Sequence, residues 1–454
     1  MKVFMLGWEF PPHISGGLGT ACYGLTKGLD QVGVDVCFVL PTAVPIDSTT
    51  HVQLRSPANL PGGGTGQYWR TETQVFEHVE LLRVAAVLQA YASPGSSEEQ
   101  IRKMVAQQQA KIVEQKMHGA AAPAAGGPPP QAAGIPSGAF VPGAGAHYGG
   151  DLMSQIHRYA SMAVELAIGE KFDLIHGHDW MTYPAAAAVK AATGKPLIVH
   201  VHSTEFDRSG ENVNQQVYDI ERMGMHTADR VVCVSHLTRT IVINRYGVDP
   251  DKVQVVYNAV ELPNGNQLDM KPIAHTEKIV LFLGRVTMQK GPEYFLRAAK
   301  LVVEKFKNVR FVIAGSGDMI RRCIEEAVAL GLGRYVTFTG FLRGGDVDRI
   351  FQMADLYVMP SVSEPFGIAP LEALSHNVPV IISKQSGVSE VLTHALKVDF
   401  WDTEEMANKI LAVLRHPPLQ RTLRQHGVIE LRKFSWADSA AKLKEIYASL
   451  CSPN

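Results

Sequence analysis

Short apolar segments alternate with segments of helical periodicity along most of this chain, and this alternation constrains the fold more than any other feature. The segments Ile279–Leu283 and Val309–Ala314, for example, are predominantly apolar, and each is followed by a glycine. Between such runs, apolar residues recur at helical spacing, as at Ile368, Leu371 and Leu374. Strands that are apolar throughout are typical of parallel sheets covered by helices on both faces. The pattern therefore predicts an α/β fold.

The length of the chain and the grouping of its predicted strands indicate two domains. A chain of 454 residues is too long for one ordinary hydrophobic core. A stretch rich in proline, glycine and polar residues follows Val260 and separates the two groups of strands. We therefore expect a first domain over 1–260, a linker over 261–276, a second domain over 277–433 and a C-terminal amphipathic helix over 434–454.

A long insertion interrupts the first domain over 93–150. Between Gly119 and Gly150, 25 of 32 residues are Gly, Ala or Pro. Such a stretch cannot bury enough side chain to offset the entropy lost on ordering, so we expect it to be flexible. A short amphipathic helix is expected just upstream, over Ile101–Ile112. The insertion is either a linker or an arm that binds a partner.

Charge, hydropathy and cysteine usage exclude several classes of protein. With 43 basic against 44 acidic residues, nothing favours broad binding of nucleic acid or of an anionic membrane. No stretch is long and apolar enough to span a bilayer. The five cysteines are scattered, with neither paired nor zinc-ligand spacing, which indicates buried thiols in a reducing compartment. We expect a soluble, cytoplasmic protein.

The stretch Ser361–Ala373, SVSEPFGIAPLEA, carries the clearest chemical signal. It places a tight turn containing glycine between a buried strand, Ala354–Pro360, and the start of a helix. The first N–H groups of a helix are unpaired and attract anions. Two carboxylates, Glu364 and Glu372, flank this turn. A sugar nucleotide offers a diphosphate for the N–H groups and two sets of hydroxyls for the two carboxylates.

Two cations bracket a second loop of the same kind. Arg285 and Lys290 follow the strand Ile279–Leu283 and a glycine, so they should lie at the same carboxyl edge of the sheet as Glu364. As a lone pair they would more often be solvated surface charges. In this position a guanidinium fork and a point charge suit a diphosphate that leaves during a reaction.

Four histidines and an aspartate gather near the ends of two predicted strands of the first domain. His176 and His178 lie two apart, as do His200 and His202, so each pair shares one face of its strand. Three interpretations remain open: ligands of a metal together with Asp179, hydrogen-bonded core histidines (His176 and His200 in particular), or polar groups at a sugar site, with His202 and Asp179 at its centre.

A glycine-rich turn follows the first predicted strand, Lys2–Trp8. It contains Gly16-Gly17-Leu18-Gly19 and opens a βαβ unit. The third small residue of a dinucleotide fingerprint would fall on Cys22, and no acidic residue is well placed after the second strand, so a nicotinamide or flavin site is disfavoured. The glycine pair instead allows backbone to approach a diphosphate or a sugar closely.

Together these motifs resemble the retaining glycosyltransferases with the GT-B fold, the family-4 enzymes above all, with glycogen and starch synthases as relatives. Glu364 to Glu372 resembles their Glu–seven residues–Glu signature, and HDW at His178–Trp180 and VHSTEF at Val201–Phe206 resemble acceptor-domain motifs. The resemblance covers nearly the whole chain outside about 41–150. It implies two Rossmann-like, doubly wound domains that face each other across an interdomain cleft, the first binding the acceptor and the second the sugar nucleotide.

The resemblance also implies roles for single residues. Glu364 would hold the donor sugar, Glu372 the ribose, and the C-terminal helix would cross back onto the first domain, an ordinary capping helix being the alternative. The catalytic residues that it implies are Arg285, Lys290, Glu364, His202 and Asp179. The further donor-binding residues that it implies are Gly16, Gly17, Phe366, Gly367, Ile368, Gly340, Phe341, Leu342, Gly315 and Asn258.

The expected reaction is transfer of a hexosyl unit, glucose in the first place, from a nucleoside-diphosphate sugar to a hydroxyl acceptor such as an α-glucan chain, with no cofactor and no metal. Ile14 stands where bacterial glycogen synthases carry a lysine, which keeps small sugars, lipid-linked sugars and sugar phosphates open as acceptors. The alternatives are a sugar-nucleotide epimerase of similar fold and a non-catalytic protein that binds nucleotide sugars or glycans.

Overall fold

The computed structural model describes residues 1–10, 16–41, 79–83, 150–261 and 276–451. The flexible insertion predicted over 93–150 lies outside these ranges except for Gly150, and so does the amphipathic helix predicted over Ile101–Ile112. Most of the linker predicted over 261–276 lies outside them as well. None of the described helices is both long and apolar enough to cross a bilayer.

The described residues form two groups of alternating strands and helices. The strands of the first group are β1 (Lys2–Leu6), β2 (Asp35–Leu40), β3 (Val79–Arg83), β4 (Leu174–His178), β5 (Leu197–Val201), β6 (Arg230–Cys233) and β7 (Val253–Val255). Its helices are α1 (Gly17–Gln31), α3 (Gly150–Gly169), η1 (Trp180–Thr182), α4 (Tyr183–Thr193), α5 (Glu205–Ser209), α6 (Gln215–Thr227), α7 (His236–Tyr246) and η2 (Pro250–Lys252).

The second group follows the same rhythm. Its strands are β8 (Lys278–Leu283), β9 (Val309–Ala314), β10 (Val336–Gly340), β11 (Leu356–Met359), β12 (Val380–Ser383) and β13 (Leu396–Val398). Its helices are η4 (Met288–Lys290), α8 (Pro292–Lys305), α9 (Ile320–Ala329), α10 (Gly345–Met353), α11 (Ala369–Ser375), α12 (Val388–Val391), α13 (Thr403–Arg415) and α14 (Pro417–Leu431), and α15 (Trp436–Cys451) ends the described chain.

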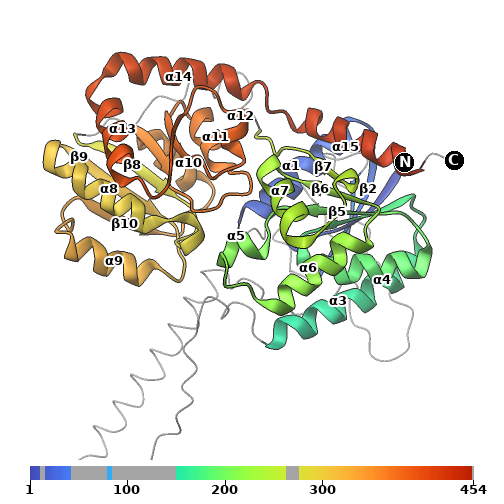
Figure 1. Ribbon diagram of the computed structural model, residues 1–454. Helices are drawn as coiled ribbons and strands as arrows, with labels where there is room; N and C mark the ends of the chain where they lie inside the picture. Colours follow the sequence, from blue (N-terminus) through green and yellow to red (C-terminus); the bar gives the residue numbers. More distant parts are fainter. Residues whose placement is uncertain (11–15, 42–78, 84–149, 262–275, 452–454) are drawn as a thin grey trace, which may run out of the picture. The chain divides into compact units, whose positions relative to one another are not determined.

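Each group builds one sheet, and every strand pairing in both sheets is parallel. The first sheet has the order β3-β2-β1-β4-β5-β6-β7 and the second the order β10-β9-β8-β11-β12-β13 (Figure 1). The strand order reverses between β1 and β4 in the first sheet and between β8 and β11 in the second. Such reversals are the switch points at which open α/β sheets bind ligands. The predicted α/β, doubly wound fold is therefore confirmed for both sheets.

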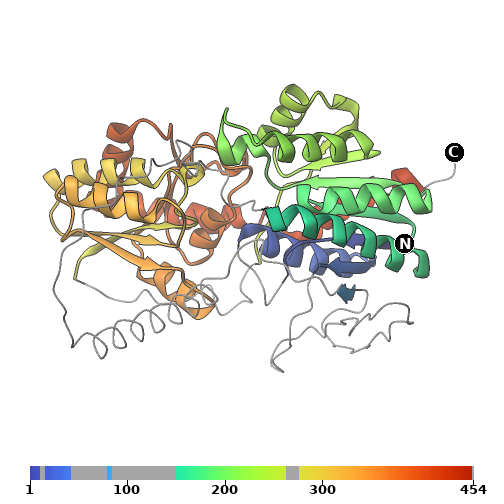
Figure 2. The same ribbon diagram turned by 90° about the horizontal axis from the view of Figure 1, so that it is seen from below.

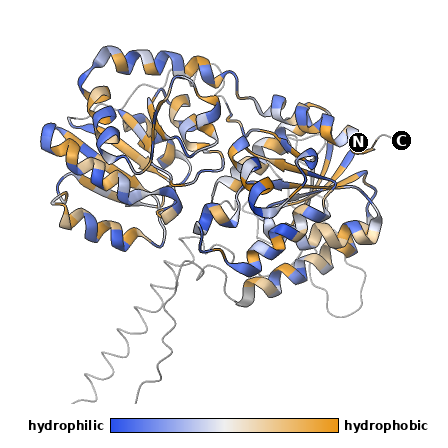
Figure 3. Cartoon of the chain, viewed as in Figure 1, coloured by the Kyte–Doolittle hydropathy of each residue, from blue (hydrophilic) through white to orange (hydrophobic). Residues whose placement is uncertain are grey.

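Helices cover both faces of each sheet (Figures 1 and 2). In the first sheet, Val3 and Met5 of β1 share a buried cluster with α1 and α15, whereas Gly177 of β4 faces Ala186 and Tyr183 of α4. In the second sheet, one buried cluster joins β8 to α8, α9 and α13, and another joins it to α10, α11 and α14. The strands are mostly apolar, whereas hydrophilic residues are spread along the helices (Figure 3).

The last helix, α15, follows α14 and packs on α1 of the first group (Figure 1). The contact is close because α1 presents glycines to it. A Cβ at Gly24 would lie 2.1 Å from the Trp436 ring, and one at Gly28 would lie 2.3 Å from the Trp436 carbonyl oxygen. Trp436, Ala440, Leu443 and Tyr447 of α15 are buried in the cluster shared with β1.

Candidate active site

The predicted site residues lie at the carboxyl ends of the strands, around the two switch points. In the second group, the loop after β8 carries Arg285 and Lys290, and the loop after β11 carries Glu364. In the first group, Gly16 and Gly17 begin α1 after β1, and Asp179 directly follows β4. Each sheet thus brings together residues that are far apart in the sequence, at the edge where such folds place their ligands.

An ion pair joins the two loops at the second switch point. Lys290 Nζ lies 2.5 Å from Glu364 Oε2, with little of either side chain exposed. Ser361 Oγ donates a second hydrogen bond to the same carboxylate oxygen at 3.1 Å. The backbone of Glu364 bonds to Gln385 and Gly387, which fixes the residue between the loops after β11 and β12. The carboxylate therefore sits in a defined position, with its charge balanced by one lysine.

The chain around Lys290 is shaped by a glycine. Gly291 has a φ of 63°, and a Cβ at this position would lie 2.3 Å from the Pro360 carbonyl oxygen. The Val362 N–H also donates to the Gln289 carbonyl oxygen at 2.9 Å. The loop of Lys290 thus packs directly against the loop of Glu364, and no larger residue fits at Gly291 without moving one of them.

Arg285 is exposed, in contrast to Lys290. Its guanidinium donates to Gln289 Oε1 at 3.3 Å. The preceding residue, Gly284, packs against Gly315 so closely that a Cβ at Gly315, whose φ is 143°, would lie 1.8 Å from the Gly284 carbonyl oxygen. Gly315 N–H in turn donates to the Gly340 carbonyl oxygen at 2.8 Å. The predicted donor-binding glycines therefore hold the ends of β8, β9 and β10 together.

The residues after Glu364 continue into α11. Phe366 is buried, with its ring 6.0 Å from that of Tyr257, and Gly367 has a φ of 101° that suits only glycine. Ile368 precedes the first residue of α11, and Glu372 lies within that helix. Burial raises the pKa of the Glu372 carboxyl, and nearby His376 acts against this rise. Phe341 and Leu342, which follow β10, are partly buried.

Asp179 ties two strand ends of the first sheet together. Its φ of 58° is one of two positive values among the described non-glycine residues. Its Oδ1 accepts hydrogen bonds from the His202 N–H at 2.7 Å and from the Ser203 N–H at 3.3 Å. Burial raises the pKa of Asp179 to about 7, although the nearby Arg208 cation acts against this rise. A backbone strained at a strand end is a feature of many functional sites.

The four predicted histidines form one stack on the face of the sheet covered by α1 and α15. Adjacent rings lie 4.2 Å apart for His176 and His178 and 4.4 Å apart for His200 and His202. His178 Nδ1 lies 2.9 Å from His202 Nε2, and His176 Nδ1 lies 2.7 Å from the Tyr447 hydroxyl. Burial lowers the pKa of all four rings, that of His202 to about 3. The predicted shared faces are confirmed, and the rings are neutral at physiological pH.

The remaining predicted residues surround this stack or lie farther along the chain. Gly16 caps α1 with extended backbone, and no atom of the described residues would lie within 4 Å of a Cβ at Gly16 or Gly17. Asn258 is buried in the segment that follows β7. The five cysteines are free thiols; four are buried, as predicted, whereas Cys451 is only partly buried.

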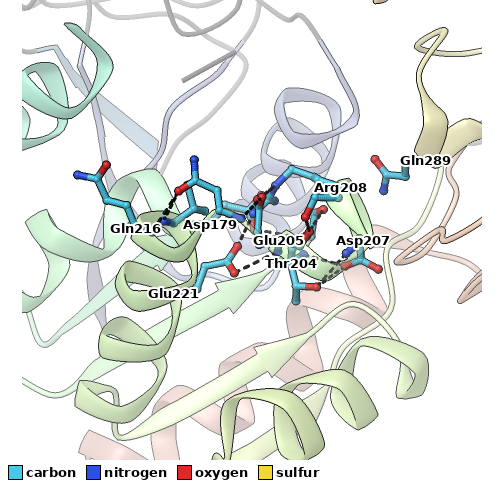
Figure 4. A network of polar contacts seen from close by, with 12 residues as sticks. Asp179, Thr204, Glu205, Asp207, Arg208, Gln216, Glu221 and Gln289 are labelled. Atoms are coloured by element: carbon cyan, nitrogen blue, oxygen red, sulfur yellow. Dashed lines mark hydrogen bonds and ion pairs between the residues drawn. The ribbon is translucent and has the colours of Figure 1, made fainter. Parts of the chain in front are cut away.

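A buried network of charges next to Asp179 was not foreseen from the sequence (Figure 4). Arg208 of α5 donates to Glu205 at 3.0 Å and to Glu221 of α6, which also accepts from the Tyr246 hydroxyl. Glu205 and Glu221 are almost fully buried. Only the capping box, Thr204 with Asp207, had a readable signal, because TEFD fits the S/T-x-x-acid pattern of a helix start.

One hydrogen bond connects this network to the loop of Glu364. Ser363 Oγ donates to Asp207 Oδ1 at 2.6 Å, and the other oxygen of Asp207 accepts from Thr204.

A surface hollow also occurs at the opposite, amino edge of the first sheet, where it is lined by Lys2, Asp173 and Lys195 among others. It includes none of the predicted site residues.

Three family descriptions match successive parts of the chain. "Starch synthase catalytic domain" matches residues 2–104, "Glycosyltransferase Family 4" residues 102–263, and "Glycosyl transferases group 1" residues 266–428. The boundary between the last two falls in the segment between the two sheets.

Curated relatives are glycosyltransferases. The chain is 34% identical to an uncharacterized glycosyltransferase of Methanocaldococcus jannaschii over 50% of this chain and 61% of that one, so the match spans less than two thirds of the relative. It is 26% identical to a D-inositol 3-phosphate glycosyltransferase of Segniliparus rotundus, over 65% of this chain and 71% of the relative.

Solved structures share the fold over nearly the whole chain. A sucrose-phosphate synthase from Thermosynechococcus elongatus superposes with a TM-score of 0.67 at 18% identity, covering 99% of this chain and 98% of the other. The Anabaena protein HepE, solved in complex with UDP-glucose, superposes with a TM-score of 0.63 at 16% identity, covering 99% and 100%.

Proposed function

Because this chain belongs to the glycosyltransferases with the GT-B fold, we propose that it transfers a glucosyl unit from a nucleoside-diphosphate sugar to a hydroxyl of an α-glucan chain, with retention of the anomeric configuration. The observation that carries this proposal is the Lys290–Glu364 ion pair, supported by an exposed Arg285, at the switch point of the second sheet. It presents the charges that a sugar diphosphate needs, on the edge where the fold binds ligands.

The ion pair exchanges partners when the donor binds. Without donor, Lys290 neutralises Glu364 at 2.5 Å. The diphosphate offers Lys290 a stronger partner, which frees the Glu364 carboxylate to accept hydrogen bonds from the hydroxyls of the donor sugar. Arg285, which is exposed and bonds to Gln289 at 3.3 Å, turns toward the same diphosphate. The two cations then stabilise the charge that develops on the leaving nucleotide, and no metal ion is required for this step.

The other predicted residues place the sugar and the nucleoside. The backbone of Phe366, Gly367 and Ile368 faces the diphosphate, Glu372 binds the ribose, and the backbone of Gly340, Phe341 and Leu342 holds the nucleobase. Gly315 allows the nucleotide to approach β9. Glucose as the sugar is supported by the likeness to HepE, whose structure contains UDP-glucose.

The first domain supplies the acceptor side. His202, whose ring is neutral, contacts the donor sugar, and Asp179 lies beside the reacting carbon, with its carboxylate held by the N–H groups of His202 and Ser203. Gly16, Gly17 and Asn258 complete the donor contacts from this side. The new bond joins the acceptor oxygen to the sugar carbon as the bond to the diphosphate breaks, and the departing phosphate oxygen takes the acceptor's proton.

The match of the first 100 or so residues to a starch synthase domain supports the α-glucan acceptor. A second acceptor class is favoured by a different observation. The Segniliparus relative is named for inositol 3-phosphate, and the solved synthase for sucrose phosphate, so a small phosphorylated polyol or sugar is the second candidate.

Two variants of arginine test the donor site. Arg285→Ala should cut turnover by about 100-fold or more, because it removes one group that stabilises transition-state charge. Arg321→Ala is the matched control, since Arg321 lies in α9 of the same domain with 89% of its side chain exposed. Turnover is measured as nucleotide release from glucose donors, with thermal melting to show that both variants fold. If Arg285→Ala retained near-normal turnover, the donor site would be placed wrongly.

Two other functions give different results in this assay. A sugar-nucleotide epimerase of similar fold would change the sugar of the donor without needing an acceptor. A non-catalytic protein would bind the nucleotide sugar and release no nucleotide at all.

A further inference from the structure

The stack of four histidines leaves an unusual number of buried polar atoms without partners. Among the described residues, five ring nitrogens are buried and make no hydrogen bond: His176 Nε2, His178 Nε2, His200 Nδ1, His200 Nε2 and His202 Nδ1. A buried polar group without a partner destabilises the folded protein. These five nitrogens are not the two that face each other between His178 and His202. They show that the stack as a whole is short of polar partners, which in proteins is usually met by ordered water or a bound ion, and they do not themselves mark the position of an ion.

A cysteine lies against this stack. Cys22 of α1 is fully buried, and its sulfur and one ring nitrogen each of His178 and His202 all lie within 4.8 Å of one another. The three residues come from three elements, α1, β4 and the end of β5. A thiol and imidazoles are the ligands that Zn²⁺ prefers in proteins, whereas a bound water molecule would gain nothing from a sulfur neighbour. The cysteine therefore favours a metal ion over water. We propose that Cys22, His178 and His202 form a binding site for a Zn²⁺-class transition metal ion.

The spacing of the two rings is close to what an ion needs. His178 Nδ1 and His202 Nε2 face each other at 2.9 Å. Two nitrogens on one tetrahedral Zn²⁺, each about 2.05 Å from the metal, lie roughly 3.3 Å apart. A separation of these two nitrogens by about 0.4 Å would let an ion replace their hydrogen bond. The Cys22 sulfur, which lies within 4.8 Å of one nitrogen of each ring, would have to come closer as well, since a sulfur and a nitrogen on one Zn²⁺ lie roughly 3.6 Å apart.

The charges around the site also favour a cation. The carboxylates of Asp179 and Glu9 are close enough to the Cys22 thiol to interact with it electrostatically. The same negative field stabilises a bound cation, and the cation in turn stabilises the thiolate that must form when the thiol loses its proton.

The bound ion is not a catalyst in this account. His202 is the residue proposed to contact the donor sugar, so an ion on its ring nitrogen competes with the substrate for that residue. The site goes beyond the proposed function and stands without it, because it rests only on the ligand set of the first domain. Three protein ligands leave a fourth position on a tetrahedral ion for water or for a ligand oxygen.

Cobalt is the probe for this site, because Co²⁺ substitutes for Zn²⁺ and reports its ligands by colour. The full-length protein, treated with a chelator, is titrated with Co²⁺. We expect the intense visible bands of tetrahedral Co²⁺ together with a thiolate-to-cobalt charge-transfer band in the near ultraviolet, and we expect Zn²⁺ to abolish both. Cys22→Ser should lose the charge-transfer band, whereas Cys323→Ser, a control in the second domain, should keep it.

Two outcomes overturn the proposal: no tetrahedral spectrum with wild-type protein, or a charge-transfer band that survives in Cys22→Ser. If Cys22→Ser fails to fold, the wild-type spectrum is joined by anomalous diffraction from crystals soaked in Zn²⁺. A peak among Cys22, His178 and His202 supports the site, and a peak elsewhere or none refutes it. Neither readout depends on glycosyl transfer, so a failure here is distinct from a failure of the proposed function.

Discussion

Replacement of Arg208 by methionine tests the buried network beside Asp179 most severely. Arg208 donates to both Glu205 and Glu221, which are 3% and 1% exposed. Methionine keeps the apolar stem but leaves two buried carboxylates without their cation. Breaking a buried ion pair by removing one partner costs about 3–5 kcal/mol. At about 2–4 °C per kcal/mol for a domain of this size, the melting midpoint of the first domain should fall by about 6–20 °C.

The deficit should also depend on pH, with a definite sign. Burial raises the pKa of Glu221, and Arg208 acts against this rise. Without Arg208 the pKa of Glu221 in the folded variant rises further, so the folded variant binds a proton more readily than the unfolded chain does. Stability falls with rising pH wherever the folded state binds more protons. The variant should therefore be weakest relative to wild type at about pH 8 and should recover as the pH falls toward about 5.

The matched control is Arg245→Met, in the same domain. Arg245 pairs with Glu211 at 2.6 Å, but the two side chains are 49% and 76% exposed, and exposed pairs contribute only about 0–1 kcal/mol. Differential scanning calorimetry of both variants and wild type, at several pH values, gives the two midpoints. Equal losses in the two variants, or a loss in Arg208→Met that grows as the pH falls, would refute the reasoning.

Two further predictions concern packing. Gly315→Ala should destabilise the protein by about 2 kcal/mol or more and weaken nucleotide binding in calorimetry, because its Cβ would lie 1.8 Å from the Gly284 carbonyl oxygen at a φ of 143°. The control, Gly333→Ala, should match wild type, since no atom of the described residues would lie within 4 Å of its Cβ. Equal melting of the two variants would contradict the packing of these loops. Trp436→Ala should destabilise the protein by about 3 kcal/mol in denaturant titration, because its ring fills the space left by the glycines of α1. The control, Trp401→Ala, should have little effect, since 58% of Trp401 is exposed. A similar loss from both variants would show that the packing of Trp436 on α1 contributes no stability.

The strands could be predicted from the sequence because they are buried on both faces. Val309–Ala314 was predicted and found with the same bounds, and Ile279–Leu283 was found one residue longer. The edge strand β3 was not predicted; its sequence, VELLR, carries a glutamate and an arginine among its apolar residues, as edge strands often do, and so lacks the continuous apolar run of the central strands. The short strand β13, which lies at an edge of the second sheet, was not predicted either.

The site was predictable where one loop carries its own chemistry and was not where the chemistry depends on packing. Glu364 lies in the turn between β11 and α11 that the sequence predicts, and its side chain pairs with Lys290 of the neighbouring loop. The pairing of Arg208 with Glu221 depends on how α6 lies under α5, which no local pattern encodes. In the same way, Cys22 meets His178 only because α1 covers the face of β4 on which that histidine lies.

The most direct test of glycosyl transfer is a donor screen by nucleotide release. ADP-, UDP- and GDP-glucose are each offered with and without a maltooligosaccharide primer, and with inositol phosphate as the second acceptor. We expect release from one glucose donor that depends on the primer. Release that depends instead on the phosphorylated polyol would replace the proposed acceptor and keep the reaction. No release with any donor and either acceptor, despite measurable nucleotide binding, would contradict the proposed function.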